Sequence, residues 1–385
     1  MKKILLGTSA LALAALAAAP AVADSNVDGA KFKVSGSMDY YWRTSDNDGA
    51  NVGGKGNEIK LHTPASEIHF DFNDVADNGL EYGARVEWRY SSGVDEAWME
   101  FGGNWGTVYF GDQDGAVDGR QIAGASVLAK GLHDTGRWMS GLNLSSNDND
   151  YDGVDSVGLI GESGDASKIY YETPSFGGFS VAASYTPDTS SSFGDGSSDD
   201  SGFQNVVEAS ARYDAEFNGV GLGLMVGALH GDAQSFTGGS DSTNNGDAFD
   251  YSASAGADLE SDVAWLAGAK VDFAGFEVAA GYGDRGENGC LKSNTNCDMG
   301  KFYDLGVAYN FDALKVGAAY FHSELNIDGN GSDDELDTFG VEANYTVAEG
   351  LSTYAGVMWA NSDDGDTAND DNDSTVFVIG TAMSF

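Results

Sequence analysis

Apolar and polar side chains alternate with a period of two along most of the chain beyond residue 30. The clearest segments are 32–43, 68–72 and 80–90, where one parity is apolar and the other polar. This alternation is typical of a β-strand whose two faces meet different surroundings. With further segments of roughly ten residues, about sixteen strands are predicted, each long enough to cross a bilayer when tilted. The further segments are 94–101, 106–112, 167–173, 178–186, 205–217, 220–231, 261–273, 276–283, 301–310, 314–323, 336–346, 351–360 and 375–385.

The connections between these segments alternate in length. One set is very short and mostly carries Gly, Asn or Asp, the residues that tight turns require. The other set is long and acidic, and only the connection after Tyr90 is short where a long one is expected. This arrangement predicts an all-β fold, an antiparallel up-and-down β-barrel of about sixteen strands. The long connections are 44–65, 112–166, 187–204, 232–260, 284–300, 324–335 and 361–374.

Two features favour a transmembrane barrel over a soluble β-sandwich. The apolar face of nearly every predicted strand lacks Asp, Glu, Lys and Arg. Aromatic residues gather near strand ends on that face, among them Trp42, Trp88, Tyr282 and Trp359. Aromatic girdles of this kind lie at the two interfaces of a membrane. The chain also ends on an amphipathic segment whose last residue, Phe385, lies on the apolar face.

The N-terminus predicts export. Lys2 and Lys3 precede an apolar run over 4–19, and Ala21-Val22-Ala23 forms a small-residue cleavage site. This pattern indicates a cleaved signal peptide over 1–23 and a mature barrel domain over 24–385. The alternative is a membrane anchor, which the cleavage site and the absence of a stop-transfer flank disfavour.

Composition narrows the possible functions. The chain has 385 residues, with 61 Asp and Glu against 19 Lys and Arg, and a net charge of −42. Such a polyanion repels phosphate backbones, which argues against a nucleic-acid partner. High charge also occurs in disordered chains, but those are poor in aromatic residues, and this chain has 20 Phe, 17 Tyr and 7 Trp. By parity, the charge lies on the polar strand faces and in the long connections.

Several segments resemble general-diffusion porins of Gram-negative outer membranes, of the alphaproteobacterial type. They are KFKVSGSMDYYWR at 31–43, NGLEYGARVE at 78–87, WGTVYFGD at 105–112 and the terminal Phe385. The resemblance implies a sixteen-stranded barrel that forms a homotrimer and has short periplasmic turns. It also implies that the third outer loop folds inward and narrows the pore. The long acidic loops would then meet outer-membrane lipid and lipopolysaccharide.

A water-filled pore must be lined by the polar strand faces. We therefore expect the loop over 112–166 to enter the lumen and to set acidic residues against a basic wall. Opposed charges of this kind create a transverse field that filters solutes, whereas a merely solvated face would have no such role. Because acidic groups are in excess, a mild cation preference is predicted for passive diffusion of ions and small hydrophilic solutes. The acidic loop residues are Asp112, Asp114, Asp118 and Asp134, and the basic wall residues are Arg43, Arg85, Arg89 and Arg212.

Two acidic stretches resemble the start of a calcium loop. A complete EF-hand needs Glu at its twelfth position, where the first stretch has Leu159 and the second has Asp337. No cofactor is required for the predicted function, but structural Ca²⁺ on the acidic loops is one interpretation and a hydrated acidic loop is the other. The candidate ligands are Asp148, Asp150 and Asp152, and Asn326, Asp328, Asn330 and Asp337.

Cys290 and Cys297 are the only two cysteines and lie in one outer connection. In an oxidising compartment this spacing favours a local disulfide. Catalysis has little support, since none of the five histidines lies in a recognised nucleophile motif. Two alternatives stay open, a substrate-selective channel and a non-conducting barrel that serves as an adhesin or a calcium-dependent surface protein.

Overall fold

The computed structural model describes most of the predicted mature chain. The described residues are 31–47, 58–62, 66–90, 92–133, 136–142, 163–189, 203–233, 258–326, 333–363, 365 and 372–385. The predicted signal peptide lies outside this set, and its assignment stays a prediction. Among the described residues, no helix is long and apolar enough to cross a membrane.

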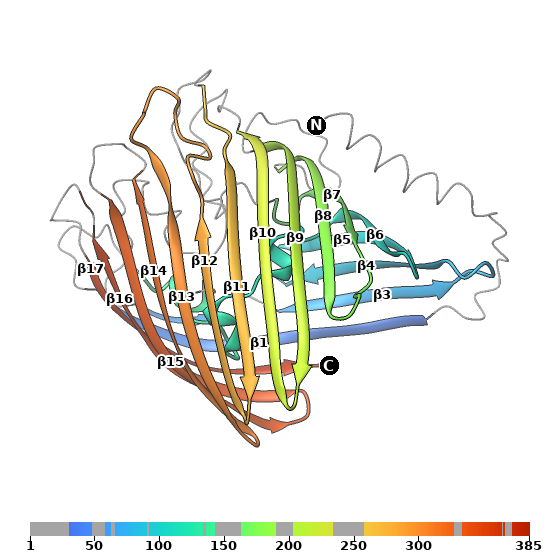
Figure 1. Ribbon diagram of the computed structural model, residues 1–385. Helices are drawn as coiled ribbons and strands as arrows, with labels where there is room; N and C mark the ends of the chain where they lie inside the picture. The colour runs from blue at the N-terminus through green and yellow to red at the C-terminus, as the bar shows by residue number, and fades with distance from the viewer. Residues whose placement is uncertain are drawn as a thin grey trace.

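One antiparallel sheet closes on itself to form a barrel (Figure 1). Both β2 and β3 pair with β1, along different parts of its length, and so form one interrupted wall strand. The seventeen strands therefore make a wall of sixteen, which confirms the predicted fold. The strands are β1 (Lys31–Asn47), β2 (Glu58–His62), β3 (Glu67–Val75), β4 (Glu81–Arg89), β5 (Gly93–Gly103), β6 (Gly106–Asp112), β7 (Ser167–Glu172), β8 (Phe179–Asp188), β9 (Phe203–Phe217), β10 (Val220–Ala233), β11 (Val263–Phe273), β12 (Phe276–Asp284), β13 (Asp298–Phe311), β14 (Leu314–Asn326), β15 (Asp334–Ala348), β16 (Leu351–Asp363) and β17 (Asn372–Ser384).

Short turns join the strands at one end of the barrel, and the strand ends that the long connections join lie at the other (Figure 1). In two of the turns both central residues have positive φ: Asn218 (52°) with Gly219 (80°), and Ala274 (49°) with Gly275 (87°). Two-residue turns of this hand match the right-handed twist of the flanking strands. These hairpins therefore set the register of β9–β10 and of β11–β12.

The last strand closes the barrel against the first. β17 pairs with β1 from Ser37 opposite Ser384 to Asn47 opposite Ser374. Two backbone hydrogen bonds of 3.0 Å join Gly36 and Phe385 in both directions. Closure satisfies the backbone groups of both edge strands, as a hydrocarbon environment requires.

The two faces of the wall differ as the period of two predicts. On β17, Phe377 is 42% exposed and points outward, whereas the next residue, Val378, points inward and is 0% exposed. The expectation that polar groups line the whole inner face is wrong for β10–β17. Apolar side chains are buried there because a loop inside the barrel covers them. They include Met225, Leu229, Leu266, Phe302, Phe321, Leu336, Met358 and Val376.

Substitutions at Val307 test whether the outward-facing side chains of the wall contact lipid. It lies on the outer face of β13 between Tyr303 and Tyr309 and is 43% exposed. In a bilayer, Val307→Lys should lower the free energy of unfolding by about 2–4 kcal/mol, because it places a charge in hydrocarbon. Val307→Leu is the matched control and should change it little. Reversible urea unfolding in lipid vesicles measures both, and equal stabilities of the two variants would show that this face does not contact lipid.

Candidate pore constriction

The described parts of the connection between β6 and β7 lie inside the barrel. The stretches 113–133 and 136–142 follow the inner wall strand by strand, from β8 and β9 round to β1. Short elements within it are two 3-10 helices, Asp118–Arg120 and Gly124–Val127, and one helical turn, Gly136–Met139. The successive contacts are the backbone N–H of Val117 with Glu208 of β9 (3.0 Å), that of Ala125 with Asp304 of β13 (3.2 Å), that of Ala129 with Glu342 of β15 (2.5 Å), and the Arg137 guanidinium with Asp39 of β1 (2.6 Å).

Glycines on the inner face of the wall make room for this loop. A Cβ at Gly268 would overlap the carbonyl oxygen of Ile122, and a Cβ at Gly306 would overlap that of Gly124. Both glycines lie within strands, where glycine often marks a close approach of another backbone. We call this row of inward-facing wall glycines the cradle. Its other members are Gly281 beside Ala123, Gly317 beside Leu128, Gly340 beside Leu132 and Gly356 beside Trp138.

Apolar side chains hold the loop in this cradle. Val127, Leu132 and Trp138 are fully buried and belong to one cluster with wall residues such as Phe302 and Met358. Removing this surface from water contributes roughly 1.5–3 kcal/mol for each large side chain. The loop and the apolar inner wall therefore stabilise each other.

Buried carboxylates of the wall receive hydrogen bonds and cations from the loop. Asp39 forms a 2.6 Å ion pair with Arg137 and accepts a 2.6 Å hydrogen bond from the Tyr354 hydroxyl. His133 Nε2 lies 2.9 Å from Asp304, and the buried Arg120 pairs with Glu172, whose side chain is partly exposed. Burial lowers the pKa of Lys130, and nearby Asp39 opposes that shift. A carboxylate buried without such partners would cost several kcal/mol.

The charge arrangement thus differs from the prediction of an acidic loop against Arg43, Arg85, Arg89 and Arg212. Arg85 pairs with Asp71 at 2.5 Å, and Arg89 pairs with Glu67 at 2.7 Å. Each of these carboxylates is directly opposite its arginine in the β3–β4 register, and Arg89 also pairs with Asp95 of β5 at 2.6 Å. Arg212 pairs with Asp214 of its own strand at 2.8 Å, and Arg43 donates to the carbonyl of Arg137 at 3.2 Å.

The predicted acidic residues lie at several positions near the ends of the loop, where it leaves β6 and enters β7. We call this region the root of the loop. Asp112 ends β6 and accepts a hydrogen bond from Ser167, while Asp118 begins the first 3-10 helix. Carboxylate oxygens of Asp114, Asp165 and Glu96 lie within 4.8 Å of one another. Partial desolvation inside the barrel raises the pKa of Asp114, although its side chain keeps contact with solvent, and repulsion from Asp165 adds to the rise. Asp134 lies outside the described residues.

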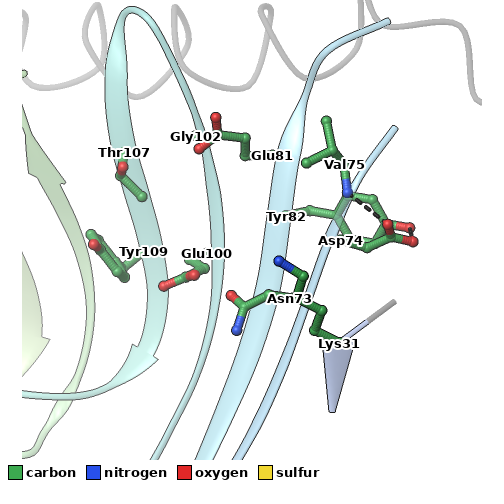
Figure 2. Close-up of a pocket in the computed structure, with 10 residues that line it drawn as sticks. All are labelled: Lys31, Asn73, Asp74, Val75, Glu81, Tyr82, Glu100, Gly102, Thr107 and Tyr109. Atoms are coloured by element: carbon green, nitrogen blue, oxygen red, sulfur yellow. Dashed lines mark hydrogen bonds between the residues drawn. The ribbon is translucent and has the colours of Figure 1, made fainter. Parts of the chain in front are cut away.

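A hollow of about 360 Å³ opens on the inner wall near the turn ends of β3–β6 (Figure 2). Figure 2 shows Lys31, Asn73, Glu81, Glu100 and Tyr109 among its lining residues. No sequence motif marks this hollow, although the parity of Glu81 and Glu100 indicates that both side chains point inward. Carboxylates therefore line the pore near the turn end as well as at the root of the loop.

The structure describes only part of the two candidate calcium stretches. Asp148, Asp150, Asp152, Asp328 and Asn330 lie outside the described residues. Asn326 donates a 3.2 Å hydrogen bond to Asp333. Asp337 lies within β15, where it accepts hydrogen bonds from Tyr320 and His322. Its described partners are thus strand neighbours rather than ligands of a calcium loop.

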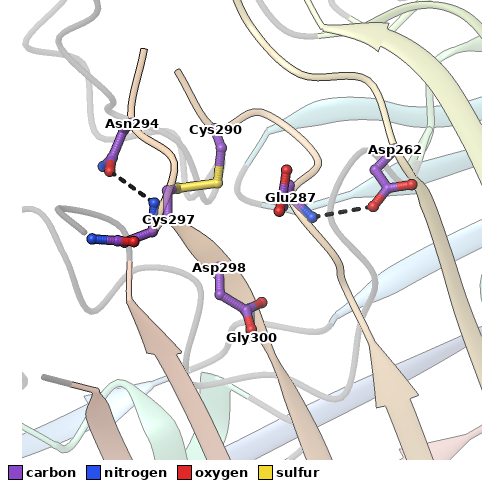
Figure 3. Close-up of a disulfide and its surroundings, with 8 residues drawn as sticks. Asp262, Glu287, Cys290, Asn294, Cys297, Asp298 and Gly300 are labelled. Atoms are coloured by element: carbon purple, nitrogen blue, oxygen red, sulfur yellow. Dashed lines mark hydrogen bonds between the residues drawn. A yellow bond between two sulfur atoms is a disulfide. The ribbon is translucent and has the colours of Figure 1, made fainter. Parts of the chain in front are cut away.

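Cys290 and Cys297 are joined by a disulfide in the outer connection between β12 and β13 (Figure 3). The bonded segment packs against 258–262, where the Glu260 N–H donates to the Cys290 carbonyl at 2.7 Å. Lys292 pairs with Asp258 at 2.8 Å, and this contact raises the lysine pKa. The disulfide therefore lies in a region where two outer connections pack together.

Gly306→Ala tests the cradle. The added Cβ would displace the Gly124 carbonyl, and the loop should then leave its seat and move in the open lumen. We expect open-channel current noise to rise several-fold in single-channel recordings.

Gly119→Ala is the matched control, since a Cβ there makes only an ordinary contact with Asp114. Its recordings should resemble those of the unchanged protein. A quiet channel in Gly306→Ala would mean that the loop does not rest on this strand.

Comparison with known proteins agrees with this architecture. A family model described as Gram-negative porin matches residues 9–367. Among solved structures, OmpF of Salmonella typhi in a complex with daunomycin is 15% identical with a TM-score of 0.60, and outer-membrane expressed OmpT of Vibrio cholerae is 15% identical with a TM-score of 0.59. The outer membrane channel DcaP of Acinetobacter baumannii is 14% identical with a TM-score of 0.55. Each likeness covers 93% of this chain and 98% of the other. No curated protein matches the chain. The structural likenesses support the fold, and the family match, which spans most of the chain, shows that this protein belongs to the Gram-negative porin family and forms an outer-membrane diffusion channel.

Proposed function

We propose that this porin passes ions and small hydrophilic solutes with a mild preference for cations, and that the loop stretches 113–133 and 136–142 narrow its pore. The observation that carries the cation preference is the group formed by Glu96, Asp114 and Asp165 at the root of the loop. Their carboxylate oxygens lie within 4.8 Å of one another. The carboxylates of Asp114 and Asp165 are open to solvent, and their negative charges produce a potential that favours cations in the adjoining lumen.

The distribution of counter-charges supports this proposal. Arg85 and Arg89 are paired with carboxylates of the wall, and Arg120 is paired with Glu172. Lys168, which interacts electrostatically with the three acids, is buried and donates to the carbonyl oxygens of Gln113 and Gly164. The basic groups are therefore engaged at fixed positions, while Asp114 and Asp165 remain exposed to solvent.

The assembly that we propose is a homotrimer in contact with outer-membrane lipid and lipopolysaccharide. Aromatic side chains on the outer faces of β1, β3 and β4 are strongly exposed in the single chain, among them Phe32, Trp42 and Trp88. A trimer form is named for OmpT of Vibrio cholerae, whose likeness to this chain has a TM-score of 0.57. Structural Ca²⁺ on the acidic outer loops is part of the same proposal. No catalytic step is included in it.

Removal of the two exposed charges tests the selectivity. Asp114→Asn with Asp165→Asn should lower the cation-to-anion permeability ratio by up to roughly tenfold for each charge, because a unit charge about 6 Å away in water changes the energies of a cation and an anion by ~0.7 kcal/mol in opposite directions. Reversal potentials in a salt gradient across a planar bilayer give this ratio.

Asp312→Asn is the matched control, because it removes a carboxylate from the turn between β13 and β14 and Asn tolerates the positive φ there. Its ratio should equal that of the unchanged channel. An unaltered ratio in the double variant would refute the assignment of selectivity to this cluster.

As the pH is lowered, the cation preference should begin to fall at a higher pH than the pKa of an ordinary carboxylate would predict. The pKa of Asp114 is raised, so this group binds its proton, and loses its charge, at a higher pH than an exposed aspartate with a pKa of about 3.9. Reversal potentials measured as the pH is lowered should show a loss of preference above that range. The same titration of Asp114→Asn should lack this step, and identical curves for both proteins would contradict the account.

A further inference from the structure

An acidic band lies on the outer face of the barrel near the loop ends of β14, β15 and β16. It follows outward-facing aromatic residues such as Tyr320, Phe339 and Trp359 along these strands. Neighbouring residues of opposite parity, Phe321, Leu336 and Thr338, are buried within the barrel. The charged side chains of the band therefore point away from the pore and take no part in conduction.

One histidine and two carboxylates of this band come together. Ligand atoms of His322, Glu335 and Asp337 lie within 4.8 Å of one another. His322 Nδ1 lies 3.1 Å from Asp337, and its Nε2 lies 3.6 Å from Glu324. Nδ1 of the imidazole therefore faces the Asp337 carboxylate, and Nε2 faces the Glu324 carboxylate.

The strand register makes this group electrostatically unfavourable without a cation. Glu335 is directly opposite Glu324 on β14 and directly opposite Asp363 on β16. Like charges at directly opposed positions destabilise an antiparallel sheet. Lys301 pairs with Glu324 at 2.5 Å, but no described lysine or arginine forms an ion pair with Glu335 or Asp337.

We propose that His322, Glu335 and Asp337 form a site for Zn²⁺ or a similar divalent transition-metal ion that links β14 to β15. An imidazole nitrogen and carboxylate oxygens are ligands that zinc accepts, whereas Ca²⁺ takes oxygen ligands. The Glu324 carboxylate beyond Nε2 matches the partner that orients a metal-bound histidine, and the Tyr320 hydroxyl holds Asp337 by a hydrogen bond. The remaining coordination positions would face solvent or the membrane interface.

A second histidine group on the inner wall provides an internal comparison. Glu67, His69 and Glu87 also lie within 4.8 Å of one another. Their carboxylates, however, are already paired with Arg89 at 2.7 Å and Arg85 at 3.2 Å. Bound arginines neutralise the ligands there, so we assign the metal site to the outer group alone.

Titration of the purified, metal-free porin in detergent with Zn²⁺ by isothermal calorimetry tests this site. One Zn²⁺ should bind per chain, and His322→Gln should weaken binding at least tenfold. Glu335→Gln, an exposed change that leaves the histidine in place, should also weaken it. His230→Gln, at an outward-facing histidine of β10, and His69→Gln, in the inner group, are matched controls that should bind as the unchanged protein does.

X-ray absorption at the zinc edge adds a structural readout. The bound ion should show one imidazole nitrogen among oxygen ligands, and this signature should disappear in His322→Gln. Binding that survives in His322→Gln, or that is lost in His69→Gln instead, would overturn the assignment. Absence of Zn²⁺ binding by the unchanged protein would overturn the proposal itself.

Discussion

The contact of the loop with the inner wall, here called its seat, is the constraint on which the rest of this pore depends. Irregular backbone inside a barrel needs hydrogen-bond partners for its peptide groups and a surface for its apolar side chains. The wall supplies both, through carboxylates such as Asp304 and Glu342 and through the apolar inner faces of β10–β17. The glycines Gly268 and Gly306 let the two backbones meet at this seat.

This seat also determines the charge of the pore. Loop cations are used to neutralise buried wall carboxylates, as Arg137 does for Asp39, rather than to line open water. The arginines of β4 are held by neighbouring carboxylates of β3, so they too have fixed partners. Exposed carboxylates at the root of the loop then remain to interact with passing ions. A net charge of −42 is therefore distributed unevenly, with the inner wall, the outer connections and an outward band each carrying part of it.

The barrel could be predicted from the sequence because strand parity and turn chemistry are local signals. Val378 and Phe377 differ in parity, and that difference alone places one inside and the other outside. The loop contacts could not be predicted in the same way, since Ala125 and Asp304 are 179 residues apart and no local pattern relates them. Inward glycines and apolar residues on β10–β17 weaken the alternation, and their reason becomes visible only when the loop lies against them. The pairing of Arg85 with Asp71, in contrast, follows from the register of the β3–β4 hairpin and could have been predicted from the sequence.

A covalent link between loop and wall tests the central claim most directly. The backbone N–H of Ala116 donates a 3.0 Å hydrogen bond to the hydroxyl of Ser184 on β8, so the two residues lie against each other. Cysteines placed together at positions 116 and 184 should therefore form a disulfide on oxidation of the folded porin, detected by mass spectrometry of the peptides, while cysteines at 116 and 221 should not. The linked channel should still conduct, because the loop is held where it already lies. Failure of the 116–184 pair to form, or an equal yield for the 116–221 pair, would show that the loop does not rest against this wall.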